Sequence, residues 1–392
     1  MRLLLIDVNC KSGSTGKIAY DLYTAVRADG DEAAICYGRG PLVKGENIYR
    51  FSPQWEVYVH ALMTRITGLT GCFSPIATHN LLKFIKQYKP DVVHIHELHA
   101  YFVNLKPLLT YLKENHIKTI WTFHCEFMYT GKCGVSLDCD RWKTGCGHCP
   151  YLREYVATQW LDFTHHMWKQ KKNMFENWKE LTIITPSQWL ADRVKQSFLS
   201  EIPVQVIHNS VNTDVFHPRP FEHLKKRHNL TDEKVVLAVA PDIMYERKGG
   251  PMVLKIAEQM QNEKIKFILI GFTPEQVETM TFPRNVIPIA RTSNQVELAE
   301  YYSMADLFVI CSMMENFPTT CLEAAACGTP ICGFDVGGVK ETYPGHDENF
   351  APYGDAETLK SQIIQILQEN KGKRDVYLRD AMLKKYLEIY SE

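Results

Sequence analysis

The sequence predicts an α/β fold of two domains, each with a parallel β-sheet that is covered by helices on both faces. The chain has 392 residues, more than one ordinary hydrophobic core accommodates. Short runs rich in β-branched residues alternate with helical patterns, and this rhythm restarts after residue 220. Such alternation is typical of βαβ units in doubly wound, Rossmann-like sheets. Two series of it predict two such domains in tandem.

The expected strands are the apolar runs, taken in chain order. The first series comprises residues 2–8, 32–38, 91–97, 119–124, 181–186 and 204–209, and the second comprises residues 234–240, 266–271, 285–290, 306–312 and 329–335. Two amphipathic patterns, 357–370 and 377–390, predict that the chain closes with helices.

The domain boundaries follow from the break between the two series, where Asn, Pro and charged residues interrupt the apolar periodicity. We predict an N-terminal domain over 1–207, a hinge over 208–220, a C-terminal domain over 221–375 and a terminal helix over 376–392. Ligands of doubly wound sheets bind beyond the carboxyl ends of the strands. A cleft between the two sheets is therefore the expected binding site.

The composition narrows the classes of partner. With 45% hydrophobic residues, 23% charged residues and a net charge of −1, the chain has no overall attraction to nucleic acid. The apolar run at its start, MRLLLIDV, is too short for the h-region of a secretory signal and is interrupted at once by an acidic residue. No run reaches the roughly 20 apolar residues that span a bilayer. The twelve cysteines are scattered, as in a reducing compartment. We expect a cytoplasmic protein without a nucleic-acid partner.

A glycine-rich turn, SGSTG, follows the first expected strand and contains Gly13 and Gly16. An ATP-binding P-loop would need a glycine where Lys11 stands and a hydroxyl residue where Ile18 stands. An ATP-dependent P-loop enzyme is therefore disfavoured. The turn and the helix after it still suit a phosphate group.

The most informative stretch is 306–338, where a strand, a loop with Glu315 and a helix with Glu323 follow one another. Pro318 stands where the first turn of the helix is expected, a place where proline loses no hydrogen bond. The exposed amides of such a helix start make an anion site, and two carboxylates beside it can accept hydrogen bonds from ribose or sugar hydroxyls. A solvated acid and a glutamate that complements the helix dipole are the alternative interpretation.

This stretch resembles the E-x7-E signature of retaining glycosyltransferases of family 4, which have the two-domain GT-B fold, and the glycines after it fit the same family. STGKIAYDL, HELHAYFVNL and WKTGCGHCP are similar to bacterial colanic-acid, capsule and exopolysaccharide glycosyltransferases. The resemblance implies that Glu315 contacts the donor sugar, that Glu323 holds the ribose and that the backbone between them binds the pyrophosphate. The further donor-binding residues that it implies are Asn316, Phe317, Pro318, Thr319, Thr320, Gly337 and Gly338.

The same resemblance implies a basic pair for the donor pyrophosphate. Lys248, which precedes a glycine, matches the family's lysine. The family's arginine is absent from its usual place, where Ala240 and Pro241 stand, and we expect Arg247 to serve instead because a guanidinium binds phosphate bidentately. An ordinary charged loop is the alternative. The turn with Gly13 and Gly16 occupies the position of the family's first glycine-rich turn, near the donor phosphate.

Three histidines stand at the ends of expected strands. The family places a histidine where His124 stands, so we expect His124 to position the donor sugar; a purely structural histidine is the alternative. His96 and His99 are expected on the acceptor side. An H-E-x-x-H zinc motif is excluded because the position that it needs is Ala100.

A cysteine-rich loop over 133–149 contains Cys133, Cys139, Cys146 and Cys149. Its CGHC turn resembles a structural zinc knuckle, and four thiolates around zinc would stiffen a long loop. Four reduced thiols, or one or two disulfides in an oxidising compartment, are the alternatives.

Residues 159–180 place aromatic and Met side chains at helical spacing, with lysines between them. Such a helix can lie on an anionic membrane, or it can pack its apolar stripe in the core. The stripe comprises Trp160, Phe163, Met167, Met174 and Trp178.

The residues and the resemblance together predict a glycosyltransferase that moves a hexose-type sugar from a nucleoside-diphosphate sugar to a surface glycan or polyprenyl-linked acceptor, with retention of configuration. The N-terminal domain is expected to bind the acceptor and the C-terminal domain the donor. We expect no metal or cofactor in catalysis, because no D-x-D pair stands at an expected strand end. We also expect peripheral contact with the inner face of the cytoplasmic membrane. The alternatives are a GT-B nucleotide-sugar epimerase or phosphorylase, and a non-catalytic, zinc-stabilised sugar- or nucleotide-binding protein.

Overall fold

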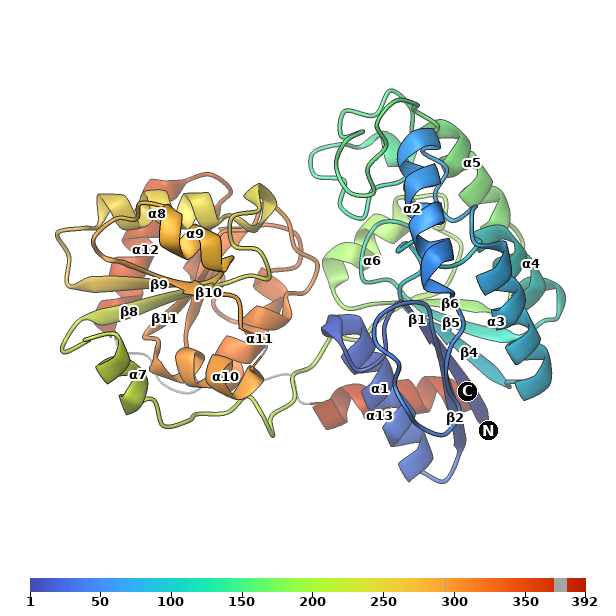
Figure 1. Ribbon diagram of the computed structural model, residues 1–392, viewed down its shortest axis with the longest axis horizontal. Helices are drawn as coiled ribbons and strands as arrows, with labels where there is room; N and C mark the ends of the chain where they lie inside the picture. The colour runs from blue at the N-terminus through green and yellow to red at the C-terminus, as the bar shows by residue number, and fades with distance from the viewer. Residues whose placement is uncertain (293, 370–378) are drawn as a thin grey trace. The chain divides into compact units, whose positions relative to one another are not determined.

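The structure is a computed structural model that describes residues 1–292, 294–369 and 379–392. It divides into two compact units, of which unit 1 is Met1–Ile207 with Leu383–Glu392 and unit 2 is His208–Met382. Each unit has one parallel sheet with helices on both of its faces, as Figure 1 shows. The predicted fold class, two doubly wound α/β domains, is confirmed.

The sheet of unit 1 has seven strands in the order β3-β2-β1-β4-β5-β6-β7. The central strand β1 is buried because helices cover both of its faces, and its residues 3–6 are fully buried. The strands are β1 (Arg2–Asp7), β2 (Glu32–Tyr37), β3 (Ile48–Arg50), β4 (Val92–Ile95), β5 (Lys118–Thr122), β6 (Leu181–Thr185) and β7 (Val204–Val206). The helices are α1 (Gly13–Ala28), α2 (Gln54–Thr67), α3 (Pro75–Tyr88), α4 (Leu105–Glu114), α5 (Thr164–Phe175), α6 (Gln188–Lys195) and the end of α13 (Arg379–Ser391).

The sheet of unit 2 has six strands in the order β10-β9-β8-β11-β12-β13. Successive side chains of a strand point to opposite faces of the sheet, so the residues of β8 alternate between two core clusters. Val235 and Leu237 belong to one cluster, and Val236 and Ala238 belong to the other. The strands are β8 (Lys234–Val239), β9 (Ile265–Phe272), β10 (Val286–Ala290), β11 (Leu307–Ile310), β12 (Ile331–Asp335) and β13 (Phe350–Pro352). The helices are α7 (Glu222–Arg227), α8 (Gly250–Gln259), α9 (Pro274–Thr279), α10 (Gln295–Met304), α11 (Thr319–Ala326) and α12 (Ala356–Glu369).

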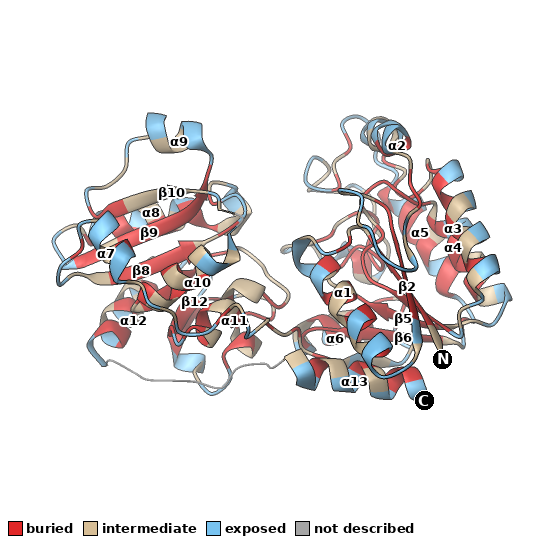
Figure 2. Cartoon of the chain, turned by 60° about the horizontal axis from the view of Figure 1, so that its bottom comes forward, coloured by how far each residue is buried: buried red, intermediate tan, exposed pale blue. Residues whose placement is uncertain are grey.

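The burial pattern in Figure 2 matches this architecture, with the strands mostly buried and the helices exposed on their outward faces. The sequence patterns missed β3 and β13, two strands of three residues each. The expected boundary between the C-terminal domain and the terminal helix, at 375 and 376, lies outside the described residues. The described part of the closing helix leaves unit 2 and joins unit 1 from Leu383 onward.

Candidate active site

Each sheet has one point at which the strand order reverses, between β1 and β4 in unit 1 and between β8 and β11 in unit 2. Loops that leave the strands at such a point turn to opposite faces, and ligands of doubly wound sheets bind there. The predicted residues that follow these strands are Gly13, Gly16, His96 and His99 in unit 1 and Arg247, Lys248 and Glu315 in unit 2.

Lys248 and Glu315 join the two loops in unit 2. The Nζ of Lys248 donates a hydrogen bond to Oε1 of Glu315 over 2.6 Å, and the side chains are 24% and 15% exposed. Lys248 ends the 3-10 turn η2 (Glu246–Lys248), and Gly249 follows it with φ 75°. A Cβ on Gly249 would stand 2.0 Å from the carbonyl oxygen of Cys311, so the turn can approach β11 only with a glycine there. An ammonium group held at this point can receive a phosphate.

The loop after β11 is shaped around the backbone of Glu315. The N–H of Gly338 donates to its carbonyl oxygen over 3.0 Å. Gly337 has φ 58°, and a Cβ there would lie 1.9 Å from the same oxygen. Helix α11 then begins at Thr319, so Pro318 is the N-cap residue and not part of the first turn as expected. Because proline has no side-chain acceptor, no N-cap side chain competes for the amides at this helix start.

Two further predicted donor residues, Glu323 and Arg247, lie beside aromatic residues. Glu323, one turn inside α11, accepts a hydrogen bond from the hydroxyl of Tyr302 over 3.1 Å. The carbonyl oxygen of Arg247 accepts from the N–H of Met313 over 3.0 Å, and its guanidinium lies 5.6 Å from the centre of the Tyr245 ring. Arg247 therefore ties η2 to the β11 loop through its backbone.

In unit 1 the two loops are joined by Asp7, a residue that the sequence analysis did not single out. Asp7 is fully buried; it accepts from the hydroxyl of Thr15 in the glycine-rich turn over 3.0 Å and from the N–H of Glu97 after β4 over 3.1 Å. Burial raises the pKa of Asp7 to about 7. Gly16 packs closely on the backbone of Asn9, whose oxygen would be 3.0 Å from a Cβ at Gly16. One carboxyl group thus fixes the glycine-rich turn to the neighbouring loop.

His124 and His96 stack at the ends of β5 and β4. The Nδ1 of His96 lies 3.0 Å from the Nε2 of His124, with the ring centres 5.3 Å apart. Burial lowers the pKa of both rings, so both are neutral near pH 7. His96 is 2% exposed, and its ring also lies against that of His94. Its expected place on the acceptor side stays a prediction, whereas its contact with His124 is direct.

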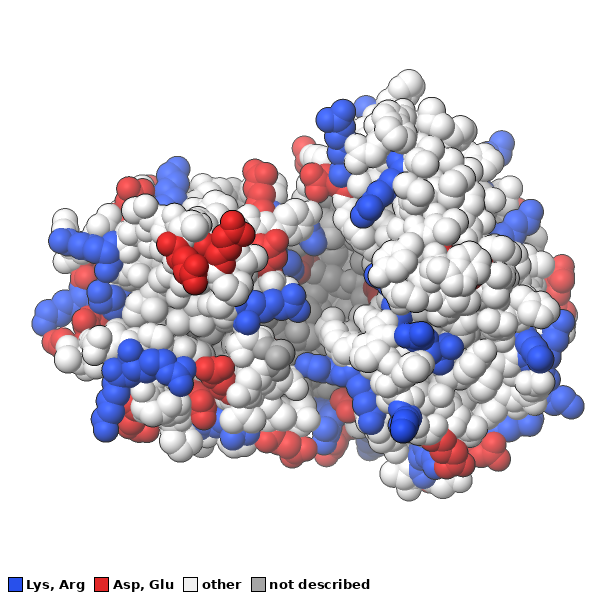
Figure 3. All heavy atoms as spheres, viewed as in Figure 1, with Lys and Arg blue, Asp and Glu red and all other residues white. Residues whose placement is uncertain are grey.

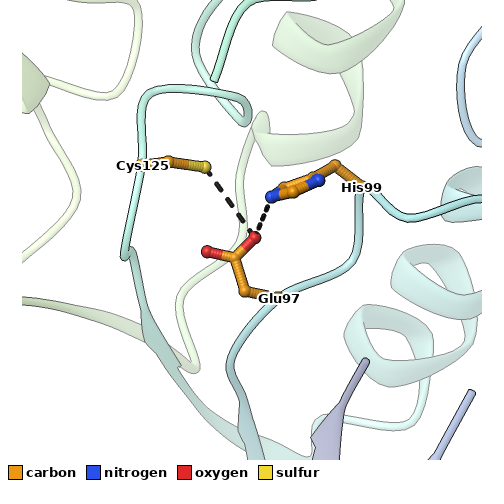
Figure 4. Close-up of side chains that lie close together, drawn as sticks. All are labelled: Glu97, His99 and Cys125. Carbon is orange, nitrogen blue, oxygen red and sulfur yellow. Dashed lines mark hydrogen bonds and ion pairs between the residues drawn. The ribbon is translucent and has the colours of Figure 1, made fainter. Parts of the chain in front are cut away.

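Glu97, His99 and Cys125 point toward one another at the same edge of the sheet, as Figure 4 shows. The Nε2 of His99 makes a close ion pair with Glu97, and the thiol of Cys125 donates to the same carboxylate over 3.8 Å. Burial opposes both charges, but their attraction outweighs it, so the pKa of His99 is raised well above its ordinary value and the pKa of Glu97 is lowered. The hydroxyl of Tyr155, 2.8 Å from the Nδ1 of His99, fixes the ring. A preformed ion pair thus stands where an acceptor-side group was expected.

The cysteine-rich loop lies in the segment between β5 and α5 of unit 1. All four predicted ligands are free thiols. They line one small pocket that is partly open to solvent. The residues are Cys133, Cys139, Cys146 and Cys149.

The apolar stripe expected over 159–180 is divided between core and surface. Its buried members, each at most 8% exposed, are Met167, Met174 and Trp178. For these the membrane interpretation is wrong and core packing is confirmed. Trp160 and Phe163, which are 72% and 40% exposed, precede α5 and remain on the surface. Within the described residues, no helix combines the length and the apolar character that crossing a bilayer requires.

Two family models match the chain, Glycosyltransferase Family 4 over residues 15–215 and Glycosyl transferases group 1 over residues 220–382. WcaC of Escherichia coli strain K12, named as a colanic acid biosynthesis glycosyl transferase, is 23% identical over 425 aligned residues that cover 100% of this chain and 99% of WcaC. N-acetyl-alpha-D-glucosaminyl L-malate synthase of Bacillus anthracis is 26% identical over 44% of this chain and 46% of its own length.

Solved structures share the fold along the whole chain. Sucrose-phosphate synthase from Thermosynechococcus elongatus has a TM-score of 0.72 at 18% identity, covering 100% of this chain and 98% of its own. HepE of Anabaena, solved in complex with UDP, has a TM-score of 0.64 at 12% identity and covers 100% of both chains. The predicted resemblance is confirmed: the chain belongs to Glycosyltransferase Family 4, and its two Rossmann-like units are the domains of a GT-B glycosyltransferase.

Proposed function

We propose that this glycosyltransferase moves a hexose-type sugar from a nucleoside-diphosphate sugar to a lipid-linked surface polysaccharide, with retention of configuration. The observation that carries the proposal is the Lys248–Glu315 pair at the strand-order reversal of unit 2. A positive charge beside the start of α11 attracts a diphosphate. A carboxylate at the same point can accept hydrogen bonds from the hydroxyls of the transferred sugar.

The chemistry that these residues supply is stabilisation of the leaving group. As the sugar departs, negative charge grows on the nucleoside diphosphate. We assign its stabilisation to Lys248, Arg247 and the amides of residues 316–320, because preorganised donors aimed at developing charge lower the barrier. Glu323, oriented by Tyr302, holds the ribose in this assignment.

In unit 1 we assign the glycine-rich turn with Gly13 and Gly16 to the donor phosphate and His124 to the donor sugar. The neutral state of His124 suits a positioning role, since it adds no charge next to the sugar. The Glu97–His99 pair is assigned to the acceptor, because a carboxylate already fixed by a histidine can accept a hydrogen bond from an acceptor hydroxyl.

A lipid-linked acceptor requires contact with a membrane, and an exposed apolar surface of unit 1 fits this need. The outward face of α2 carries Trp55, Tyr58, Val59 and Leu62 at helical spacing, each 46% to 65% exposed. The turn that contains Trp160, Leu161 and Phe163 packs against the end of α2, where the N–H of Gln159 donates to the oxygen of Arg65 over 2.8 Å. In Figure 3 the surface over α2 is mostly uncharged. Exposed aromatic residues on such a mostly uncharged helix face suit a membrane interface. We propose that this α2 face lies on the inner surface of the cytoplasmic membrane.

The test is transfer by the purified protein. UDP-, GDP- and ADP-linked sugars are offered with a polyprenyl-linked acceptor, and the anomeric configuration of the product is read by NMR. UDP-sugars come first because HepE of Anabaena, with the same fold, has been solved with UDP-glucose. Lys248→Met and Glu315→Gln should each lower kcat/KM by about 100-fold or more, the usual effect of losing one preorganised group.

A matched control comes from the other ends of the same two strands. Lys234, at the start of β8, pairs with Asp306, just before β11, over 2.8 Å. Lys234→Met and Asp306→Asn remove an exposed ion pair and should leave kcat/KM within about two-fold. Unchanged transfer in the Lys248 and Glu315 variants would refute the site. Turnover without an acceptor would identify an epimerase, consumption of phosphate a phosphorylase, and donor binding without turnover a binding protein.

A further inference from the structure

The segment between β5 and α5, residues 123–163, is long for a chain without regular structure. Its described helical content is the single 3-10 turn η1 (Arg141–Lys143). It nevertheless buries Tyr129 and Trp142 almost completely. Irregular segments of this length inside a compact domain are uncommon, and such segments are usually held by an added cross-link or metal.

Hydrogen bonds are aimed at the sulfurs of this loop. The N–H of Gly131 donates to the Sγ of Cys146 over 3.1 Å, and the N–H of Tyr151 bonds to the thiol of Cys149. The thiols of Cys133 and Cys149 are hydrogen-bonded to each other. Backbone N–H groups directed at sulfur favour the thiolate form, which is the form that binds metals.

Two buried ammonium groups stand next to these thiols. Lys171 is fully buried; its Nζ donates to the carbonyl oxygens of Phe127 and Thr130 and lies 3.4 Å from the centre of the Phe127 ring. Lys132 is 1% exposed and donates to the carbonyl oxygens of Glu154 and Val156. Their described contacts are neutral oxygens and a ring. Burial lowers the pKa of Lys171 to about 7, and negative charge on the nearby thiols, that of Cys146 first, opposes this shift and favours the ammonium form. A buried cation is unfavourable unless an opposite charge compensates it.

We propose that Cys133, Cys139, Cys146 and Cys149 bind one structural Zn²⁺ ion. Binding releases the four thiol protons, and the resulting site of four thiolates and one zinc ion carries a charge of −2. The buried ammonium groups of Lys171 and Lys132 supply the matching positive charge. The ion joins distant parts of the 123–163 segment into one unit.

Zinc binding requires the loop to close so that the four sulfurs approach one another. Zinc–sulfur bonds of about 2.3 Å in a tetrahedron place the sulfurs about 3.8 Å apart. The four thiols line one cavity, but among the described residues the ligand group within 4.8 Å is Glu97, His99 and Cys125. Gly145 and Gly147, both with φ 141°, flank Cys146 and permit the inward shift.

The Glu97–His99–Cys125 group is a weaker candidate for the same ion, although its atoms are closer together. Its carboxylate is already neutralised by His99. Beside the thiol cavity stand two buried lysines, Lys132 and Lys171, and one carboxylate, that of Asp162, which accepts from the N–H of Cys149 over 2.7 Å. A zinc ion at Glu97 would have to displace the proton of His99. The charge balance therefore favours the four cysteines.

Elemental analysis of the full-length protein, purified without chelators, tests this site. We expect about one zinc ion per chain, released when a mercurial reagent blocks the thiols. Cys146→Ser and Cys149→Ser should each lose most of the zinc. Cys72→Ser, which alters another partly buried thiol of unit 1 outside the cavity, should keep it, and so should Cys125→Ser. Lys171→Met should lower zinc affinity by about 10- to 100-fold, as loss of an outer-sphere partner does.

Exchange with Co²⁺ provides a second readout that does not depend on the variants' folding, because a tetrahedral tetrathiolate site gives an intense charge-transfer spectrum. Two results would overturn the proposal. One is a zinc-free protein in which all twelve cysteines titrate as free thiols, and the other is a protein in which fewer than twelve titrate because some of them form disulfides. Zinc that is lost in Cys125→Ser but retained in Cys149→Ser would place the ion at the Glu97 group and would also overturn it.

Discussion

Replacing Asp7 by asparagine should change how the stability of unit 1 depends on pH. Burial raises the pKa of Asp7 to about 7, from an ordinary value of 3.8. Between these values the unfolded chain has released the proton and the folded unit keeps it, so the stability of the folded unit falls as the pH rises. Asparagine is neutral at every pH and still offers one acceptor to Thr15 or Glu97, the donors to Asp7.

The size of the effect follows from the pKa difference. Between pH 5 and the folded pKa of about 7, Asp7 removes about 1.4 kcal/mol of stability per pH unit. The wild-type unit 1 should therefore lose about 2.5 kcal/mol more than Asp7→Asn between pH 5 and pH 8. Thr15→Val is the matched control, since it deletes a hydrogen bond to Asp7 without deleting the titrating group. It should cost about 1 kcal/mol at pH 5 and more at pH 8, because the hydrogen bond from Thr15 lowers the pKa of Asp7; its pH effect therefore has the opposite sign to that of Asp7→Asn.

Urea unfolding followed by tryptophan fluorescence measures this difference in unit 1 alone, because all seven tryptophans precede residue 208. The free energy of unfolding of Asp7→Asn, relative to the wild type, should rise by about 2.5 kcal/mol from pH 5 to pH 8. An equal difference at both pH values would mean that Asp7 does not titrate in this interval. The argument from burial would then fail.

Two further predictions concern the donor loop and the membrane surface. Gly337→Ala should raise the KM for the donor sugar by about ten-fold or more, because its Cβ would stand 1.9 Å from the oxygen of Glu315. Gly345→Ala is the control, because Gly345 has φ 78° and no atom lies within 4 Å of the added Cβ, so this variant introduces backbone strain without a contact. Equal KM values in the two variants would contradict the role of the contact with Glu315. Trp55→Ser and Leu62→Ser should weaken co-sedimentation with anionic vesicles, whereas Leu42→Ser, 75% exposed elsewhere in unit 1, should not. Equal losses in all three variants would contradict a specific α2 face.

The residues of unit 2 that are assigned to the donor could be singled out in the sequence because they lie in short continuous motifs. Glu315, Pro318 and Glu323 fall within nine residues, and their spacing follows from one strand, one loop and one helix. The hydrogen bond between Lys248 and Glu315 spans 67 positions. Only the parallel pairing of β8 with β11 brings their loops together, so no local spacing could have indicated the contact.

The unit 1 residues were harder to predict because each is a single polar residue at a strand end. Asp7 receives one bond from 8 positions away and another from 90 positions away. A lone aspartate after an apolar run is equally typical of a solvated turn. Cys125 was overlooked for a similar reason, since a cysteine beside His124 has no spacing rule that links it to Glu97. The roles of Asp7 and Cys125 depend on their burial and on the order of the strands in the sheet, and the hydrophobic periodicity of the sequence encodes neither.

The closing helix α13 shows why a predicted helix does not predict its partner. The hydroxyl of Tyr390 lies 2.6 Å from the Nδ1 of His94, and the hydroxyl of Tyr386 lies 3.0 Å from that of Thr122. His94 packs on His96, which in turn bonds His124. The last turns of the chain therefore complete the packing behind the histidine that is assigned to the donor sugar. The apolar period of α13 requires only that one face be buried, whereas its tyrosine hydroxyls need polar partners in that buried place. Unit 1 supplies these partners at the ends of β4 and β5, and this polar match places the end of α13 in unit 1 although the chain reaches it from unit 2.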